Sequence, residues 1–114
     1  MLHTELKAWK MSMDLVVQVY ELTNNFPKKE LYGLTSQLRR AIVSVPANIS
    51  EGSATSSNKE YIRFLNMSLG SLAEVETLMI ISNRLGYCKL NSELNISDVR
   101  KLISGTIRYL KTNN

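Results

Sequence analysis

Residues 34–52 read LTSQLRRAIVSVPANISEG, and this stretch predicts a helix that contains a proline. Its apolar side chains recur at the three- and four-residue spacing of one helix face: Leu34, Leu38, Ala41, Ile42, Val45 and Ile49. Pro46 lies inside this pattern, where it has no N–H to donate and costs about 3 kcal/mol or more. We therefore expect the helix to bend at Pro46 and to end at Gly52, which suits the left-handed C′ position. Asn48 and Glu51 are expected to bond the backbone groups that the bend frees.

Length and composition indicate one globular domain. The chain has 114 residues, of which 44% are hydrophobic and 21% are charged, so residues 1–114 are expected to share a single core. The single cysteine, Cys88, cannot form an internal disulfide, which indicates a reducing cytoplasm. Residues 1–10 lack the apolar segment of a signal peptide, and no apolar stretch approaches the roughly 18 residues of a membrane span. We expect a cytoplasmic protein without a membrane partner.

Four segments carry helical patterns and are joined by short connections. We expect helices over about residues 4–24, from 31–35 to 52, from 57 to 85, and within 91–111. Ser57 and Glu60 have the S-x-x-E spacing of a capping box, which marks the start of the third helix, and Gly86 marks its end. Ser97 is an alternative start for the fourth helix. Short connections favour antiparallel neighbours, so the predicted fold is all-α, an antiparallel up-down-up-down four-helix bundle.

The first helix is apolar over a wider arc than one neighbour requires. Its main apolar face consists of Leu6, Trp9, Met13, Val16, Val17 and Tyr20. A second apolar set on the opposite side consists of Met11, Leu15, Val19 and Leu22. A helix packed on one surface needs an apolar stripe of only about 100° or somewhat more. Deep burial of the helix within the domain is one explanation for this wide apolar arc, but we favour contact of the second set with another subunit. In the third helix, Gly70 and Ser71 are small enough to let such a subunit approach closely.

Long motifs of this chain resemble one known family, the 23S rRNA intervening-sequence proteins, which includes the accessory variability protein of diversity-generating retroelements. The residues that carry the resemblance are LKAWK (6–10), DLV (14–16), QLRRAIVSVPANISEG (37–52), SNKEYIRFLN (57–66) and LGSLAEVETL (69–78). The match covers roughly Leu6 to Tyr87. The resemblance implies an antiparallel four-helix bundle that assembles into a ring-like homopentamer with a basic surface. It also implies that the retroelement relatives bind nucleic acid and a reverse transcriptase.

Basic residues supply the candidate sites for nucleic acid. The net charge is +4, and residues 58–114 hold eight basic and five acidic side chains. Arg39 and Arg40 can either contact phosphate or form ion pairs with the carboxylates of Glu51, Glu74 or Glu76. A second group shares the outward side of the fourth helix and can track a phosphate backbone or simply be solvated: Arg100, Lys101, Arg108 and Lys111.

The remaining polar residues do not suggest an enzyme. Glu74 and Glu76 are two residues apart and diverge on a helix, His3 is isolated, and Cys88 has no second cysteine or histidine nearby in the sequence. We expect no catalytic residue, metal or cofactor. Two functions remain open: a nucleic-acid-associated oligomer that binds RNA or DNA, or a protein scaffold such as an accessory subunit of a reverse transcriptase.

Overall fold

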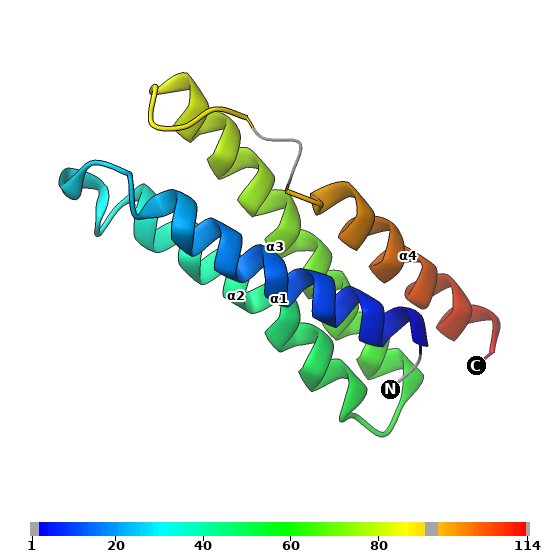
Figure 1. The fold of residues 1–114 in the computed structure, drawn as a ribbon. Helices are drawn as coiled ribbons and strands as arrows, with labels where there is room; N and C mark the ends of the chain where they lie inside the picture. The colour runs from blue at the N-terminus through cyan, green and yellow to red at the C-terminus, as the bar shows by residue number, and fades with distance from the viewer. Residues whose placement is uncertain (1–2, 91–93, 114) are drawn as a thin grey trace.

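The computed structural model describes residues 3–90 and 94–113, which form four long α-helices and one short 3-10 turn. The elements are α1 (His3–Thr23), η1 (Lys28–Glu30), α2 (Leu34–Ser53), α3 (Asn58–Arg84) and α4 (Ile96–Thr112). Each helix packs against the next one along the chain, and α4 also packs against α1 (Figure 1). The all-α four-helix prediction is confirmed, and the packing is consistent with the up-down-up-down arrangement. Helix α4 begins at Ile96, after Asn95, whereas the earlier start allowed at residues 91–93 lies outside the described residues.

The two predicted boundaries of α3 are confirmed. The Ser57 hydroxyl accepts a hydrogen bond from the Glu60 N–H at 3.1 Å, which caps the start of the helix. The Glu60 carboxylate forms an ion pair with Arg63 at 3.0 Å, and the guanidinium holds the pKa of that carboxyl below its usual value. At the other end, Gly86 has a φ of 80°, the left-handed conformation that favours glycine.

Helix α2 continues through Pro46 and ends at Ser53. Side chains bond the backbone around the proline: Asn48 Nδ2 donates to the Ser44 carbonyl at 2.8 Å, and the Ser68 hydroxyl of α3 donates to the Val45 carbonyl at 2.8 Å. The predicted role of Glu51 is wrong, because this exposed side chain makes no hydrogen bond or ion pair to any part of the chain that the structure describes.

The expected role of Gly52 is also wrong. Gly52 lies inside the helix, which ends one residue later and is followed by Ala54 in the right-handed helical conformation. A Cβ atom on Gly52 would lie 2.9 Å from Tyr61 Cδ1 and 3.0 Å from Phe64 Cβ. The glycine is therefore needed because α2 and α3 approach each other closely, not because the chain turns there.

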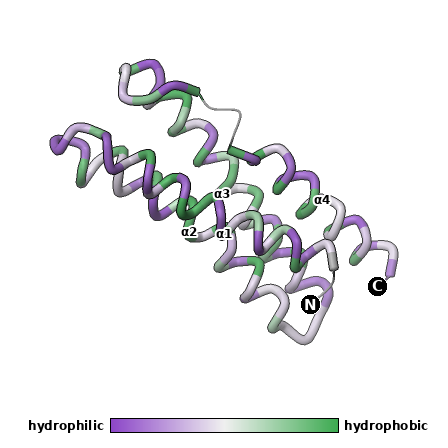
Figure 2. The backbone as a smooth tube through the Cα atoms, viewed as in Figure 1, coloured by the Kyte–Doolittle hydropathy of each residue, from purple (hydrophilic) through white to green (hydrophobic). Residues whose placement is uncertain are grey.

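The core receives side chains from all four helices, and hydrophobic and hydrophilic residues alternate along each of them (Figure 2). The predicted outer set of α1 is wrong for Leu15 and Val19, which are each 1% exposed and belong to the core. Met11 and Leu22 are half-buried and pack against that core.

Four of the six residues in the main apolar face predicted for α1 lie on the side that is left uncovered, whereas Trp9 and Val16 are partly buried and pack against the core. Leu6, Met13, Val17 and Tyr20 are 37–57% exposed. The inner side also carries the buried polar residues Glu5, Ser12 and Thr23. These polar residues make the inner arc look less apolar than the outer one, which explains the reversal.

At the end of the bundle where α1 joins α2 and α3 leads to α4, one carboxylate joins two turns. Glu30 Oε1 accepts the Leu34 N–H at 3.3 Å, at the start of α2, and Glu30 Oε2 accepts the Tyr87 hydroxyl at 2.9 Å. This hydrogen bond raises the pKa of Tyr87. The Tyr87 ring also packs against Phe26 with centroids 5.6 Å apart.

Helix α3 is long and apolar enough, by length and composition, to cross a membrane, which the sequence pattern did not lead us to expect. The core helix of a helical bundle meets the same criterion. Helix α3 packs against α2 on one side and α4 on the other, which accounts for its buried apolar residues, while Met67, Ile80 and Ile81 remain 41–45% exposed.

Candidate nucleic-acid interface

Helix α4 separates an apolar inner side from a basic outer side. Its inward residues are buried in the core: Val99, Ile103, Thr106, Ile107 and Leu110. The Thr106 hydroxyl lies 3.1 Å from the Thr4 hydroxyl of α1, which fixes the helix against its neighbour. Lys101, Arg108 and Lys111 are exposed on the outer side. We call these three residues the α4 basic surface.

Arg100 is engaged within the bundle. Its Nη2 lies 3.0 Å from Glu76 Oε1 of α3, and the two side chains are 37% and 49% exposed. Glu76 was among the predicted partners of Arg39 and Arg40, so the structure assigns this carboxylate to a different arginine. Because its charge is balanced by Glu76, Arg100 adds less to the field of the α4 basic surface than its three neighbours do.

Arg39 joins α2 to the last turn of α1, and the predicted carboxylate partners are wrong for it. Its Nε donates to the Thr23 hydroxyl at 2.9 Å, and its Nη2 donates to Asn24 Oδ1 at 3.1 Å and to the Tyr20 carbonyl at 3.3 Å. The guanidinium also lies 4.6 Å from the centre of the Tyr20 ring. A cation beside the carbonyl end of a helix is favourable, so Arg39 has a structural role.

Arg40 is exposed and makes no ion pair or hydrogen bond to the described part of the chain. It lies on α2, and among the described residues α2 and α4 do not pack against each other. The six predicted nucleic-acid residues therefore do not form one surface. Three of them constitute the α4 basic surface, two are engaged in helix packing, and Arg40 lies apart.

Tyr109 is an outward aromatic residue of α4. It is 50% exposed and follows Arg108 directly in α4. Between this pair and Lys101 lies Gly105, whose missing Cβ leaves open backbone beside Arg108 Nη2, 3.7 Å from the Cβ position. Exposed aromatic rings beside cations can stack on nucleotide bases. In the sequence, the adjacent basic and aromatic residues at 108–109 are the signal from which this possible stacking position could have been predicted.

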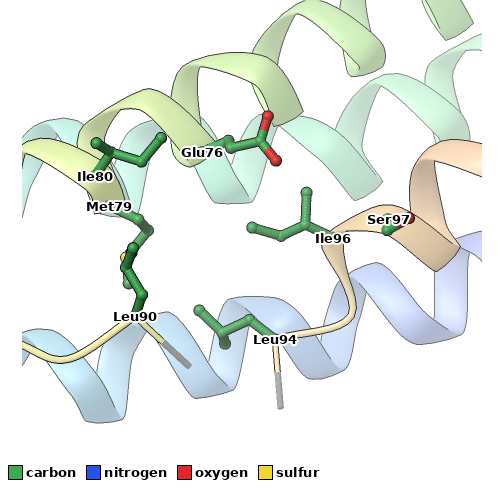
Figure 3. A pocket seen from close by; sticks show the side chains of 7 residues that line it. All are labelled: Glu76, Met79, Ile80, Leu90, Leu94, Ile96 and Ser97. Atoms are coloured by element: carbon green, nitrogen blue, oxygen red, sulfur yellow. The ribbon is translucent and has the colours of Figure 1, made fainter. Parts of the chain in front are cut away.

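A cavity of about 510 Å³ lies where the start of α4 meets α3 (Figure 3). It is lined by Glu76, Met79, Ile80, Leu90, Leu94, Ile96 and Ser97. The Glu76 carboxylate is already bonded to Arg100, and most of the other lining side chains are apolar. The cavity is suited to an apolar group rather than to phosphate.

Burial shifts the pKa of two ionisable side chains upwards, which favours their neutral forms. Burial raises the pKa of the Cys88 thiol, which disfavours the reactive thiolate. Burial also raises the pKa of Tyr61, and the carboxylate of Glu5 adds to this shift. Across residues 3–90 and 94–113, no three His, Cys, Asp or Glu side chains are grouped so that they could hold a metal ion.

Comparison with known proteins agrees with the fold. The model of the 23S rRNA-intervening sequence protein family matches residues 4–109. Among solved structures, the chain is similar to a protein of unknown function from the S23 ribosomal protein family of Bacteroides thetaiotaomicron VPI-5482. The two share 19% sequence identity with a TM-score of 0.68, and the alignment covers 96% of each chain. At this identity the likeness shows the fold alone. No curated protein matches the chain.

Proposed function

The chain belongs to the family of 23S rRNA-intervening sequence proteins, and on this premise we propose that it is a non-enzymatic, cytoplasmic protein that binds structured RNA. The observation that carries the proposal is the α4 basic surface. Lys101, Arg108 and Lys111 are exposed and are not balanced by ion pairs within the part of the chain that the structure describes. The family name refers to ribosomal RNA, which makes RNA the first ligand to test and duplex DNA the second.

The physical basis of this binding is neutralisation of phosphate. Each basic side chain that contacts a phosphate releases a condensed counterion, so affinity falls steeply as salt increases. Tyr109 supplies a half-exposed ring next to Arg108, which adds a surface for an unpaired base. The contacts to phosphate carry no sequence preference, and we therefore expect recognition by charge and shape.

The test is equilibrium binding of structured RNA and of duplex DNA over a range of salt concentrations. In the triple variant Lys101→Gln, Arg108→Gln, Lys111→Gln, we expect weaker binding and a salt slope reduced by about one for each phosphate that is no longer neutralised. The matched control removes the same charge from the other end of the bundle: Lys28→Gln, Lys29→Gln, Lys89→Gln. Equal reductions in affinity in the two triple variants would show that α4 has no special role. An absence of binding at low salt would refute the proposal.

Self-association is a further part of the proposal. The exposed apolar residues on α1, which include Met13 and Val17, favour a homo-oligomer, and the resemblance to the family implies five as its number. Sedimentation at micromolar concentration tests both points. A monomer would contradict this part of the proposal and would leave RNA binding to be judged by its own assay.

A protein scaffold is the second candidate function. The same exposed apolar side of α1 could contact a different protein, for which a reverse transcriptase is the candidate that the resemblance suggests. Capture of partners from the native host, with and without nuclease, separates the two functions. A partner that stays bound after nuclease treatment supports the scaffold, whereas one that is released indicates a bridge of nucleic acid.

A further inference from the structure

A small cavity lies at the corner where α1 ends, η1 turns and α2 begins. Its volume is about 160 Å³, which is larger than the space that one water molecule needs. The corner is at the end of the bundle away from the two chain termini (Figure 1). The polar residues that line the cavity are Thr23, Asn24, Lys28, Thr35 and Arg39, none of which belongs to the α4 basic surface.

Thr35 gives the first indication that the cavity is a binding site. The residue is 3% exposed, and its hydroxyl is buried without a hydrogen-bond partner in the part of the chain that the structure describes. Such a hydroxyl loses its hydration and receives nothing in exchange, which destabilises the folded protein. Because Thr35 forms part of the cavity wall, an acceptor bound in the cavity would satisfy this donor.

Positive charge on two sides of the cavity is the second indication. Arg39 lies four residues after Thr35 and therefore on the same side of α2. Its Nε and Nη2 bond the end of α1 and the turn that follows, whereas Nη1 takes no part in these bonds and can donate to a ligand. Lys28 lines the cavity from η1 and is exposed. Guanidinium and ammonium groups are the side chains that bind phosphate oxygens in proteins.

The acidic residues of this region lie outside the cavity. The Glu30 carboxylate accepts the Leu34 N–H and the Tyr87 hydroxyl, and Glu21 is exposed on α1. Neither acidic residue lines the cavity. Thr35 also lies in the first turn of α2, and this end of a helix favours a negative charge. A group bound here therefore meets hydrogen-bond donors and positive charge, with no carboxylate among the described lining residues.

We propose that this cavity binds a phosphate group. Arg39 and Lys28 balance the charge of the group, and the Thr35 hydroxyl donates to one of its oxygens. The ligand is orthophosphate or the terminal phosphate of a nucleic-acid strand, which present the same doubly charged set of oxygens near neutral pH. A phosphodiester inside a strand carries a sugar on both sides and fits so small a cavity less well. This inference does not depend on the α4 basic surface.

The decisive experiment is thermal unfolding in millimolar inorganic phosphate, with chloride at equal ionic strength as the reference. For the wild type we expect a saturable rise in Tm of about 5 °C at ten times the dissociation constant. Thr35→Val keeps the shape of the side chain and removes only the hydroxyl. Without phosphate its Tm should equal or exceed that of the wild type, because no hydrogen bond is lost. With phosphate the rise should disappear, whereas the general stabilisation of proteins by this salt would act on both chains alike.

Lys28→Gln and Lys29→Gln form a matched pair. The two lysines are neighbours in η1 and both are exposed, but only Lys28 lines the cavity. Isothermal titration calorimetry should show a dissociation constant for phosphate that rises about tenfold in Lys28→Gln and far less in Lys29→Gln. Equal weakening in the two variants would show only a general positive field around η1. Acetate that binds as tightly as phosphate would show a carboxylate site. Either result overturns the proposal.

One RNA, prepared with a 5′-phosphate or a 5′-hydroxyl, distinguishes the two sources of the phosphate group. Tighter binding of the 5′-phosphate form, lost in Thr35→Val, assigns the site to the end of a strand. Equal binding of the two forms, together with the rise in Tm, assigns it to the free ion. Absence of both effects refutes the site. Because Lys28 is part of the control variant for α4, that comparison uses the 5′-hydroxyl RNA, so the failure of either proposal is recognised by itself.

Discussion

The seam between α2 and α3 and the outer side of α4 are held by different kinds of contact. The α2–α3 seam, comprising Val45, Gly52, Tyr61 and Ser68, is buried and includes a hydrogen bond from one helix to the backbone of the other. Helix α4 also buries its inner side in the core, but its outer side is tied to α3 through the half-exposed pair of Arg100 with Glu76. Buried, closely packed contacts tolerate little change, whereas exposed ion pairs contribute little stability. The outer side of α4 can therefore be altered to test function without unfolding the bundle.

The largest effect is expected at Gly52. The substitution Gly52→Val adds side-chain atoms where a Cβ alone would lie 2.9 Å from Tyr61, so the helices must separate. We expect the free energy of unfolding to fall by about 2–3 kcal/mol, the upper range for an overpacked core. Urea denaturation at fixed protein concentration measures it.

The control for Gly52 is Gly70→Ala. Gly70 also lies in a helix but has open space around its Cβ position, and alanine favours helix over glycine by about 1 kcal/mol. We expect unchanged or slightly increased stability. An equal decrease in stability at both glycines would contradict the explanation by the close approach of α2 and α3, because nothing lies near the Cβ position of Gly70.

The next effect concerns the hydrogen bond across the seam. Ser68→Ala removes the donor to the Val45 carbonyl and should lower the free energy of unfolding by about 1–2 kcal/mol, because the interaction is buried. Ser82→Ala is the matched control: this serine is equally buried in the same helix, but its hydroxyl bonds the Leu78 carbonyl of its own helix. The seam explanation requires the decrease in stability at Ser82 to be clearly smaller.

A third effect appears only at alkaline pH. Because burial raises the pKa of Tyr61 above its ordinary value of 10.0, the folded protein keeps a proton that the unfolded chain releases. The contribution to stability is therefore fully present below about pH 10 and is lost as the pH rises further. In Tyr61→Phe this decline should be weaker, as followed by thermal unfolding across pH 8–11. Tyr32→Phe controls for the removal of one phenol, and an identical decline in the two variants would contradict the explanation.

The smallest effect is expected for the attachment of α4. Arg100→Ala should cost less than about 1 kcal/mol, since both partners of its ion pair are partly exposed and screened by salt. A double-mutant cycle with Glu76→Ala measures the coupling energy. A coupling energy as large as the effect of Ser68→Ala would remove the contrast between the two regions.

Local sequence signals predicted the helices well. Ser57 and Gly86 act through their own backbone neighbourhood, so a cap and a stop can be recognised from a few residues. The family resemblance was likewise carried by contiguous motifs, and the family model confirms it.

Contacts between helices were predicted less well. The hydrophobic pattern of α1 gives two apolar arcs but not which arc faces inward, and the buried Glu5 and Ser12 favoured the wrong choice. Arg39 was expected to seek a carboxylate, yet its partners are neutral groups of α1 and the turn that follows it. Gly52 was assigned to a turn because its close neighbours Tyr61 and Phe64 lie on the next helix. These relations depend on how whole helices pack, which no short motif encodes.

The Glu30 carboxylate has a consequence for local unfolding. Its two oxygens hold the start of α2 through Leu34 and the turn after α3 through Tyr87, although these segments are far apart in the sequence. Glu30 lies in η1, so displacement of η1 removes the acceptors of both segments at once. Amide hydrogens on both sides should therefore exchange with solvent as one cooperative unit, and Glu30→Gln should accelerate exchange in both segments together.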